Sequence, residues 1–161
     1  MLINTGIPTE DDFAGIVPSE QRFAAGAVAV IECYQEIPCD PCVKACNRKA
    51  ITIDGDINGL PVLNPDLCNG CGFCITSCPG LAIFVIDKTY SDSHALVDLP
   101  FEYVPVPEAG QTVTGLNRAG DELGEFEVKK VLYAGSKNKT HIVSIVVPIN
   151  LAMEVRDIKV E

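Results

Sequence analysis

Apolar and polar residues alternate or cluster over short distances along this chain, which predicts short strands and short helical turns. Strands are expected where apolar residues run together or alternate between Gly-, Pro- and Asn-rich breaks. In the first half of the chain, the predicted strands span 27–32, 51–53, 61–63 and 82–87, and the predicted helical turns span 42–49 and 75–78. The resulting element order is β-α-β-β-α-β.

The second half of the chain has a different pattern. Apolar or alternating stretches recur there between glycine-containing breaks, which favours a small all-β module built as an open barrel or sandwich. These stretches are 101–105, 112–116, 125–133 and 141–148, with a last strand at 156–160.

Residues 1–26 predict an extended N-terminal arm with a short turn or helix near Ser19. Such an arm either wraps its own domain or docks on a partner, and the pattern does not choose between the two. The chain is therefore expected to have three parts, namely the arm at 1–26, a compact domain at 27–88 and the β module at 89–161.

Composition supports a packed globular protein, since 47% of the 161 residues are hydrophobic and 21% are charged. The apolar runs are too short to span a bilayer, and the first residues lack the basic and apolar regions of a secretory signal, so a cytoplasmic location is the default expectation. The net charge of −10 argues against nucleic-acid binding, because the chain offers no basic patch to neutralise phosphates.

The eight cysteines change the picture most, because all of them lie between residues 33 and 78. Disulfides are not expected without export, so metal ligation is favoured. Residues 68–79 read CNGCGFCITSCP, which is C-x2-C-x2-C-x3-C-P, the spacing of bacterial iron–sulfur ligands. Zinc ribbons also use C-x2-C pairs, but they do not need the third and fourth cysteines at these offsets.

The earlier run, CYQEIPCDPCVKAC at 33–46, is irregular, because its first cysteine lies three residues too early. A shift of the sequence by 32 residues superimposes the other three cysteines on those of the second run, which indicates an internal duplication. Cys68 then aligns with Glu36, and Cys33 is left to take the role of first ligand. If residues 34–38 cannot loop away from the iron, this site would instead hold a three-iron cluster or bind an open iron.

These motifs make residues 29–88 resemble the two-cluster bacterial ferredoxin family, in which the fourth cysteine of each run binds the other cluster. The resemblance implies two [4Fe-4S] clusters in a ferredoxin-like domain. Together with the strand pattern after residue 88, it predicts an α+β fold in which a ferredoxin-like two-cluster domain is followed by a small all-β barrel-like module. It implies that cluster 1 is held by Cys33, Cys39, Cys42 and Cys78. It implies that cluster 2 is held by Cys46, Cys68, Cys71 and Cys74.

The combination of arm, cysteine domain and β module also looks like the small iron–sulfur subunit of multi-subunit flavin-dependent dehydrogenases that oxidise amino acids such as proline or hydroxyproline. Stretches 4–8, 28–42 and 152–158 contribute to this resemblance. It implies a hetero-oligomer in which the chain relays electrons from FAD-containing dehydrogenase subunits to an external acceptor. A further small iron–sulfur subunit is an optional member of such a complex. The alternatives are a free-standing soluble ferredoxin with added interaction segments and a regulatory module with structural or sensing clusters.

The rest of the chain predicts no catalytic site, so no substrate turnover is expected from this chain alone. No Gly-x-Gly-x-x-Gly follows a predicted strand. Residues 115–120, GLNRAG, lack the Lys-Ser/Thr ending of a phosphate loop and are predicted to form a β-turn. His94 and His141 are isolated and are expected to be surface or packed histidines.

Replacing Cys33 with alanine tests the role of the displaced cysteine. The Cys33→Ala variant should convert or destroy the first cluster and leave the second intact, because only one cluster would lose a ligand. Iron and sulfide analysis with EPR of the reduced protein measures this. Retention of both clusters would show that Cys33 is not a ligand.

Overall fold

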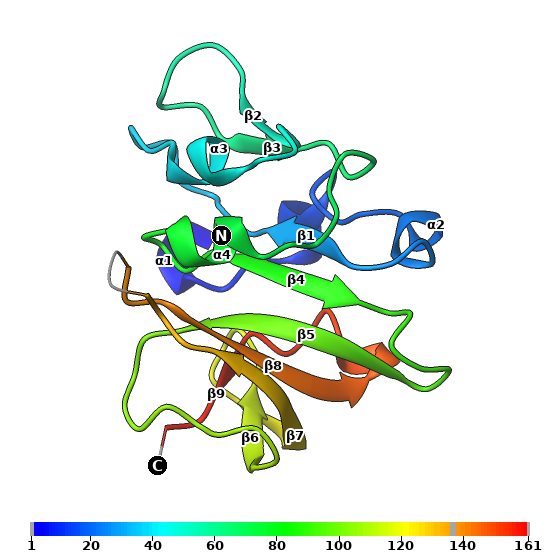
Figure 1. The fold of residues 1–161 in the computed structure, drawn as a ribbon. Coiled ribbons are helices and arrows are strands. Elements are labelled where there is room, and N and C mark those ends of the chain that lie inside the picture. The colour runs from blue at the N-terminus through cyan, green and yellow to red at the C-terminus, as the bar shows by residue number, and fades with distance from the viewer. Residues whose placement is uncertain (1, 136–137, 161) are drawn as a thin grey trace.

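The structure is a computed structural model, and it describes residues 2–135 and 138–160. Up to residue 88, the elements are α1 (Leu2–Thr5), η1 (Glu10–Phe13), α2 (Glu20–Phe23), β1 (Val28–Ile31), α3 (Pro41–Ala45), β2 (Ile51–Ile53), β3 (Pro61–Leu63), α4 (Phe73–Ser77) and β4 (Ile83–Asp87). Beyond it, they are β5 (His94–Phe101), β6 (Thr112–Leu116), β7 (Glu122–Leu132), β8 (His141–Pro148), η2 (Ile149–Leu151) and β9 (Asp157–Ile158). In Figure 1, α3, β2 and β3 form a layer above β1, α4 and β4, and the later strands lie below them.

Strands β2 and β3 have the predicted bounds, whereas helices α3 and α4 are shorter or begin earlier than predicted. The predicted strand at 101–105 is wrong, because β5 ends at Phe101. Pro105 and Pro107 lack the backbone N–H that a strand ladder needs. The alternation that forms β5 begins earlier, at Ala95. No helix in the described part of the chain is long and apolar enough to cross a membrane.

One antiparallel sheet connects both halves of the chain. Among the described residues it contains seven strands in the order β1-β4-β5-β8-β7-β6-β9, and β2 and β3 form a separate hairpin. The expected boundary between residues 88 and 89 falls in the turn between β4 and β5, whose strands pair directly, with Val85 opposite Asp98 and Asp87 opposite Leu96. The segment after residue 88 therefore continues the sheet of the cysteine-bearing half.

Strand β1 is apolar on both faces, and each face is buried against a different part of the molecule. Val28 and Val30 belong to a core formed with β5, β7, β8 and the C-terminal segment. Ala29 and Ile31 point to the other side and pack in a second core with cysteines of α3 and α4. Successive side chains of a strand point to opposite faces, so an unbroken apolar run is what a strand buried on both sides requires.

Strand β4 repeats this alternation beside β1. Phe84 and Ile86 face the core shared with the C-terminal strands, and Ile83 and Val85 face the cysteine side. The two strands pair antiparallel, with Ile31 opposite Ile83. The cysteine-bearing layer is consequently supported from below by the rest of the sheet (Figure 1).

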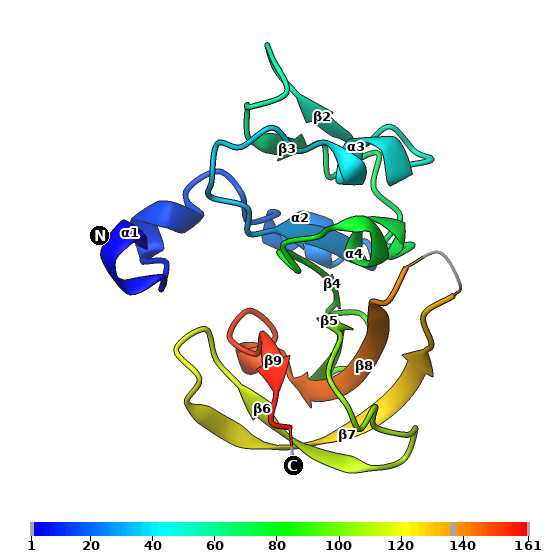
Figure 2. The same cartoon turned by 90° about the vertical axis from the view of Figure 1, so that its left-hand side faces the viewer.

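The C-terminal strands curve strongly around the short strand β9 (Figure 2). Register shifts occur between Gly115 and Leu116 in β6 and between Val128 and Lys130 in β7. Such bulges bend a strand and increase its local twist. The ring of Phe126 lies over Gly115, where a Cβ atom would come within 2.5 Å of the ring, so a residue without a side chain is needed at this bend.

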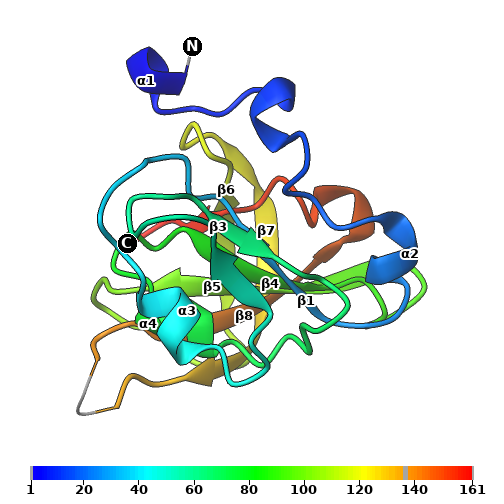
Figure 3. The same ribbon diagram turned by 90° about the horizontal axis from the view of Figure 1, so that it is seen from above.

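Part of the N-terminal arm packs on its own domain. Phe23 of α2 is fully buried in the core shared with the C-terminal strands, and Lys88 lies over its ring. Lys88 also forms an ion pair with Glu20 at 2.8 Å, and Ser19 caps α2, where a helix or turn was expected. The α2 segment of the arm therefore packs on its own domain, which was the first of the two alternatives. Helix α1 lies at the outer edge of the molecule (Figure 3).

Candidate metal centres

The eight cysteines line two separate cavities. The Cys33 cavity is lined by Cys33, Cys39, Cys42 and Cys78. The Cys68 cavity is lined by Cys46, Cys68, Cys71 and Cys74. Each cysteine thus lies in the set that the resemblance implied for it, and all eight are free thiols that form no disulfide. Binding of iron at these thiols stays a prediction.

Two short helices distribute their cysteines between both cavities. In α3, Cys42 lies inside the helix and lines the Cys33 cavity, whereas Cys46 is the C-cap residue and lines the Cys68 cavity. In α4 the order is reversed, because Cys74 inside the helix lines the Cys68 cavity and the C-cap Cys78 lines the Cys33 cavity. Because the chain leaves the helix axis at the C-cap, the cysteine inside each helix and the cysteine at its C-cap line different cavities.

Backbone N–H groups point at the sulfur atoms of the Cys68 cavity. The Sγ atom of Cys68 accepts hydrogen bonds from the N–H groups of Ala29 at 3.4 Å and Gly70 at 3.5 Å. The Sγ atom of Cys46 accepts one from the N–H of Ala50 at 3.2 Å. Such bonds stabilise the negative charge of a thiolate or of an iron–sulfur cluster and raise its reduction potential.

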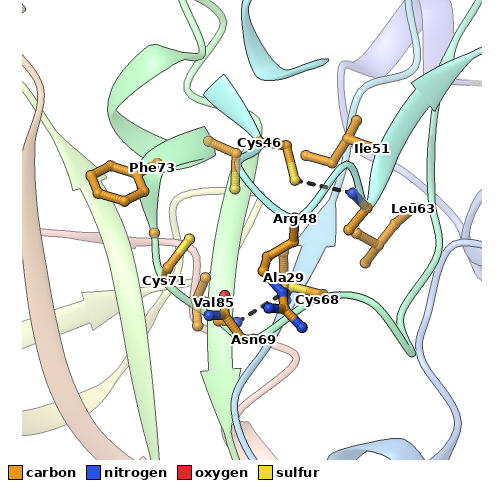
Figure 4. A pocket seen from close by; sticks show the side chains of 14 residues that line it. Ala29, Cys46, Arg48, Ile51, Leu63, Cys68, Asn69, Cys71, Phe73 and Val85 are labelled. Carbon is orange, nitrogen blue, oxygen red and sulfur yellow. Dashed lines mark hydrogen bonds between the residues drawn. The ribbon is translucent and has the colours of Figure 1, made fainter. Parts of the chain in front are cut away.

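Apolar walls and one open edge complete the Cys68 cavity. Figure 4 shows the side chains of Ile51, Leu63 and Val85 around it. At its edge Cys71 is exposed, and Phe73 is 54% exposed. The site is therefore shielded on the side of the core and reaches the molecular surface at Cys71.

Gly70 is needed at its position in the loop that carries Cys68. Its φ of +67° lies in the left-handed region, which disfavours side chains. A Cβ atom at this position would lie 2.5 Å from the Cβ of Ala27, at the beginning of the segment that leads into β1. The close approach of the two backbones places the loop against β1, and with it Cys68.

The Cys33 cavity lies at the end of β1. Cys33 follows the strand, and residues 34–38 have neither helix nor strand structure. Gln35 and Ile37 of this segment are exposed but also line the cavity, so the inserted residues form a rim across it. On the other side, Cys78 accepts a hydrogen bond from the N–H of Ala82 at 3.5 Å.

Burial and crowding of thiols raise the pKa of three cysteines. Burial and, to a smaller extent, the neighbouring thiols of Cys68 and Cys71 raise the pKa of Cys74 to about 12. Burial, followed by Cys78, raises the pKa of Cys42 to about 11, and burial raises that of Cys33. As free thiols these groups hold their protons at neutral pH, so a cationic centre must displace the protons when it binds.

The arrangement fits an iron–sulfur cluster better than a single ion. Within the described ranges, no three His, Cys, Asp or Glu side chains are grouped closely enough to hold one metal ion. A zinc ion would need its four ligands to converge at about 2.3 Å from one point. Four soft thiols spread around an apolar cavity, with N–H donors aimed at sulfur, are the surroundings that a cluster with several irons requires.

Four charged residues near the cavities were not singled out from the sequence. Glu32, directly before Cys33, accepts hydrogen bonds from Arg118 and Arg156. Arg22 donates to backbone carbonyls around Cys68. The turn predicted for residues 115–120 covers only 117–120, because Gly115 and Leu116 end β6, and it is closed by the bond from Gly120 N–H to the Asn117 carbonyl. The role of Arg118 within it has no local signal. The sequence marks Glu32 only as a charged residue at the end of the apolar run of β1.

Comparisons with known proteins agree with this geometry. Residues 37–82 match the family model of the 4Fe-4S dicluster domain. The chain is 44% identical over 52 residues to the ferredoxin-type protein NapF of Escherichia coli strain K12, which covers 31% of this chain and 32% of that protein. It is 37% identical over 78 residues to an uncharacterized ferredoxin of Methanocaldococcus jannaschii, with 44% and 45% covered. A third relative is the B component of the polysulfide reductase of Wolinella succinogenes, 44% identical over 45 residues, with 28% and 22% covered.

Residues 37–82 are a 4Fe-4S dicluster domain of the ferredoxin type. The chain spans less than half the length of each of these relatives, and the matched segment 37–82 includes neither Cys33 nor the strands after β4. No solved structure matches the chain.

Replacing Gly70 with alanine should damage the Cys68 cavity. The Gly70→Ala variant is expected to bind less iron than the wild type, because the added methyl group would push the Cys68 loop away from Ala27. Gly120→Ala is the matched control, since Gly120 has a φ of +85° but nothing within 4 Å of the place that a Cβ atom would take. The control should cost about 1–2 kcal/mol of stability and keep its iron. Equal iron content in the two variants would contradict the role given to Gly70.

Proposed function

We propose that this chain is an electron-transfer subunit that carries electrons between a partner flavoprotein dehydrogenase and an external acceptor. The observation that carries the proposal is the sorting of eight free cysteines into two sets of four around two cavities of one domain. When bound, two [4Fe-4S] clusters supply one-electron redox chemistry at these positions.

In this proposal the first set binds one cluster and the second set the other. The first set consists of Cys33, Cys39, Cys42 and Cys78, and the second of Cys46, Cys68, Cys71 and Cys74. Because α3 and α4 each contribute to both sets, the protein holds the two centres at a fixed separation. A fixed pair of centres suits a relay, in which an electron enters at one centre and leaves at the other.

The protein's own residues set the conditions for this transfer. Apolar side chains such as Ile51 and Val85 exclude water from the Cys68 cavity, and N–H groups hydrogen-bond to its sulfur atoms. The exposed Cys71 brings the edge of this cavity to the surface, where a partner protein can approach. No candidate catalytic side chain was identified in the sequence, which supports a role in transfer without turnover.

A role as one subunit of a larger oxidoreductase is supported by two relatives. The B component of polysulfide reductase and the polyferredoxin-like subunit of the aliphatic sulfonate oxidoreductase of Pyrococcus furiosus are, by their names, components of larger oxidoreductases. We propose a hetero-oligomer with FAD-containing dehydrogenase subunits of the amino-acid-oxidising type, a partner class that rests on the resemblance of stretches 4–8, 28–42 and 152–158. We also propose a cytoplasmic location, because cysteines that bind iron must stay reduced and reducing compartments keep them from forming disulfides.

Analysis of the purified chain tests the cofactor content. Protein prepared without oxygen should contain about eight irons and about eight sulfides, because each set of four cysteines suits one four-iron cluster. After reduction with dithionite, EPR should show two interacting signals. About four irons per chain would contradict the second centre, and clusters that accept no electron would favour a structural or sensing role.

Purification from the native host tests the partner. A tagged chain, isolated without oxygen, should carry stoichiometric subunits that contain FAD, and reduced flavin in these subunits should bleach the iron–sulfur absorbance of the chain. Addition of the free chain to the isolated flavoprotein should restore the same transfer. A lone monomer with two reducible clusters would contradict the subunit assignment and favour a free-standing ferredoxin.

A further inference from the structure

Three largely or partly buried arginines, Arg22, Arg118 and Arg156, contact the chain beside the two cysteine cavities, and all three lie outside the matched segment 37–82. Arg22 comes from the N-terminal arm, whereas Arg118 and Arg156 come from the C-terminal half. The two groups of contacts reach different cysteines.

The first group is a triad around Glu32. Arg118 binds the carboxylate through two hydrogen bonds, from Nε to Oε2 at 2.8 Å and from Nη2 to Oε1 at 2.7 Å. Arg156 donates from Nε to Oε1 at 2.7 Å. The side chains of Glu32, Arg118 and Arg156 are 7%, 12% and 4% exposed. Water therefore cannot replace these bonds easily, and the loss of one partner would leave a buried charge.

The arginines of this triad are themselves fixed. Arg118 donates to the Met153 carbonyl at 2.7 Å and lies over the ring of Phe13. Arg156 lies over the ring of Phe84 in β4. The triad thus joins the turn between β6 and β7, the C-terminal segment and the end of β1 into one rigid contact.

Glu32 is the last anchored residue before Cys33. Its N–H donates to the Ala82 carbonyl at 2.8 Å, which extends the pairing of β1 with β4 by one residue. Beyond Cys33 the chain enters the irregular segment 34–38, of which residues 35–38 are exposed. Without the triad, Cys33 would lie at a free strand end, where backbone order is usually lowest.

The second group is centred on Arg22. Its guanidinium donates to the carbonyls of Pro65 at 2.7 Å, Gly26 at 2.9 Å, Ala27 at 2.9 Å and Cys68 at 2.8 Å. These bonds tie the loop that carries Cys68 to the segment that leads into β1. The planar guanidinium can bridge several carbonyls at once, which an ammonium group cannot do in the same geometry.

We propose that each group positions the first cysteine of one of the two cysteine runs, 33–46 and 68–79, so that Glu32, Arg118 and Arg156 place Cys33, and Arg22 places Cys68. The proposal rests on the assignment of the two cysteine sets in the proposed function. The four residues act through the backbone and are positioning residues. The centre with the displaced cysteine then depends on Arg118 and Arg156 of the C-terminal half, with Phe13 of the arm packed against Arg118, whereas the Cys68 centre depends on Arg22 of the arm.

Selective loss of one centre is the test. Full-length Glu32→Gln and Arg118→Gln should fall from about eight to about four irons per chain and lose the EPR signal that Cys33→Ala loses. Full-length Arg22→Gln should show a similar fall but lose the signal that Cys71→Ser loses. The matched control is Glu122→Gln, which breaks the exposed ion pair with Lys159 and should keep both signals.

Conservative variants separate geometry from charge. Arg118→Lys and Arg22→Lys keep the positive charge but lack the planar fork, so each should lose the same signal as its glutamine counterpart. Lysine variants with wild-type iron and EPR would overturn the proposal, because charge alone would then suffice.

The remaining outcomes are also decisive. Loss of both centres in every variant, together with a lowered unfolding midpoint by circular dichroism, would show a general structural role and overturn the proposal. Retention of both centres would overturn it as well. A wild-type chain without about eight irons would instead contradict the proposed function, so the two failures can be told apart.

Discussion

Strands β1 and β4 bury apolar side chains on both of their faces, and the rest of the structure depends on this double burial. Val30 and Ile86 pack on one side with the C-terminal strands, and Ile31 and Val85 pack on the other with the cysteine-bearing helices. Each fully buried Val or Ile side chain contributes about 1.5–3 kcal/mol through removal from water. The cysteine layer has only short helices and one short hairpin, and this shared pair of strands gives it a rigid base.

The two cavities are joined through the same short elements. Cys42 and Cys46 belong to α3 or its end but line different cavities, and Cys74 and Cys78 do the same in α4. A displacement of either helix would therefore alter both sets of thiols. Because Cys42 and Cys74, whose pKa values are raised, must lose their protons to bind iron and lie in the core of this layer, binding of iron and formation of the layer are expected to be coupled.

Polar contacts supply what the apolar core cannot. Apolar packing fixes the faces of β1, but it does not determine where the chain leaves the strand. The buried triad at Glu32 and the carbonyl contacts of Arg22 lie at the two places where a first cysteine follows or adjoins this strand. A buried ion pair is weak evidence for stability, because desolvation offsets much of the attraction, and its directional hydrogen bonds are better suited to fixing geometry.

Features that depend only on residues close together in the chain could be predicted from the sequence. Cysteine spacing and the internal duplication predicted two runs of four cysteines, and the resemblance to two-cluster ferredoxins implied the exchange of Cys46 and Cys78 that the two cavities also have. Local patterns predicted the bounds of β2 and β3. Local pattern was misleading near Phe101, because β5 ends there although apolar residues recur as far as Val106. Tertiary structure alone decided the pairing of β4 with β5 and the contacts of Glu32 with arginines 86 and 124 residues away. The physical reason is that a guanidinium reaches its partner through the path of the folded chain, and no periodicity or spacing in the sequence records which distant residues that path brings together.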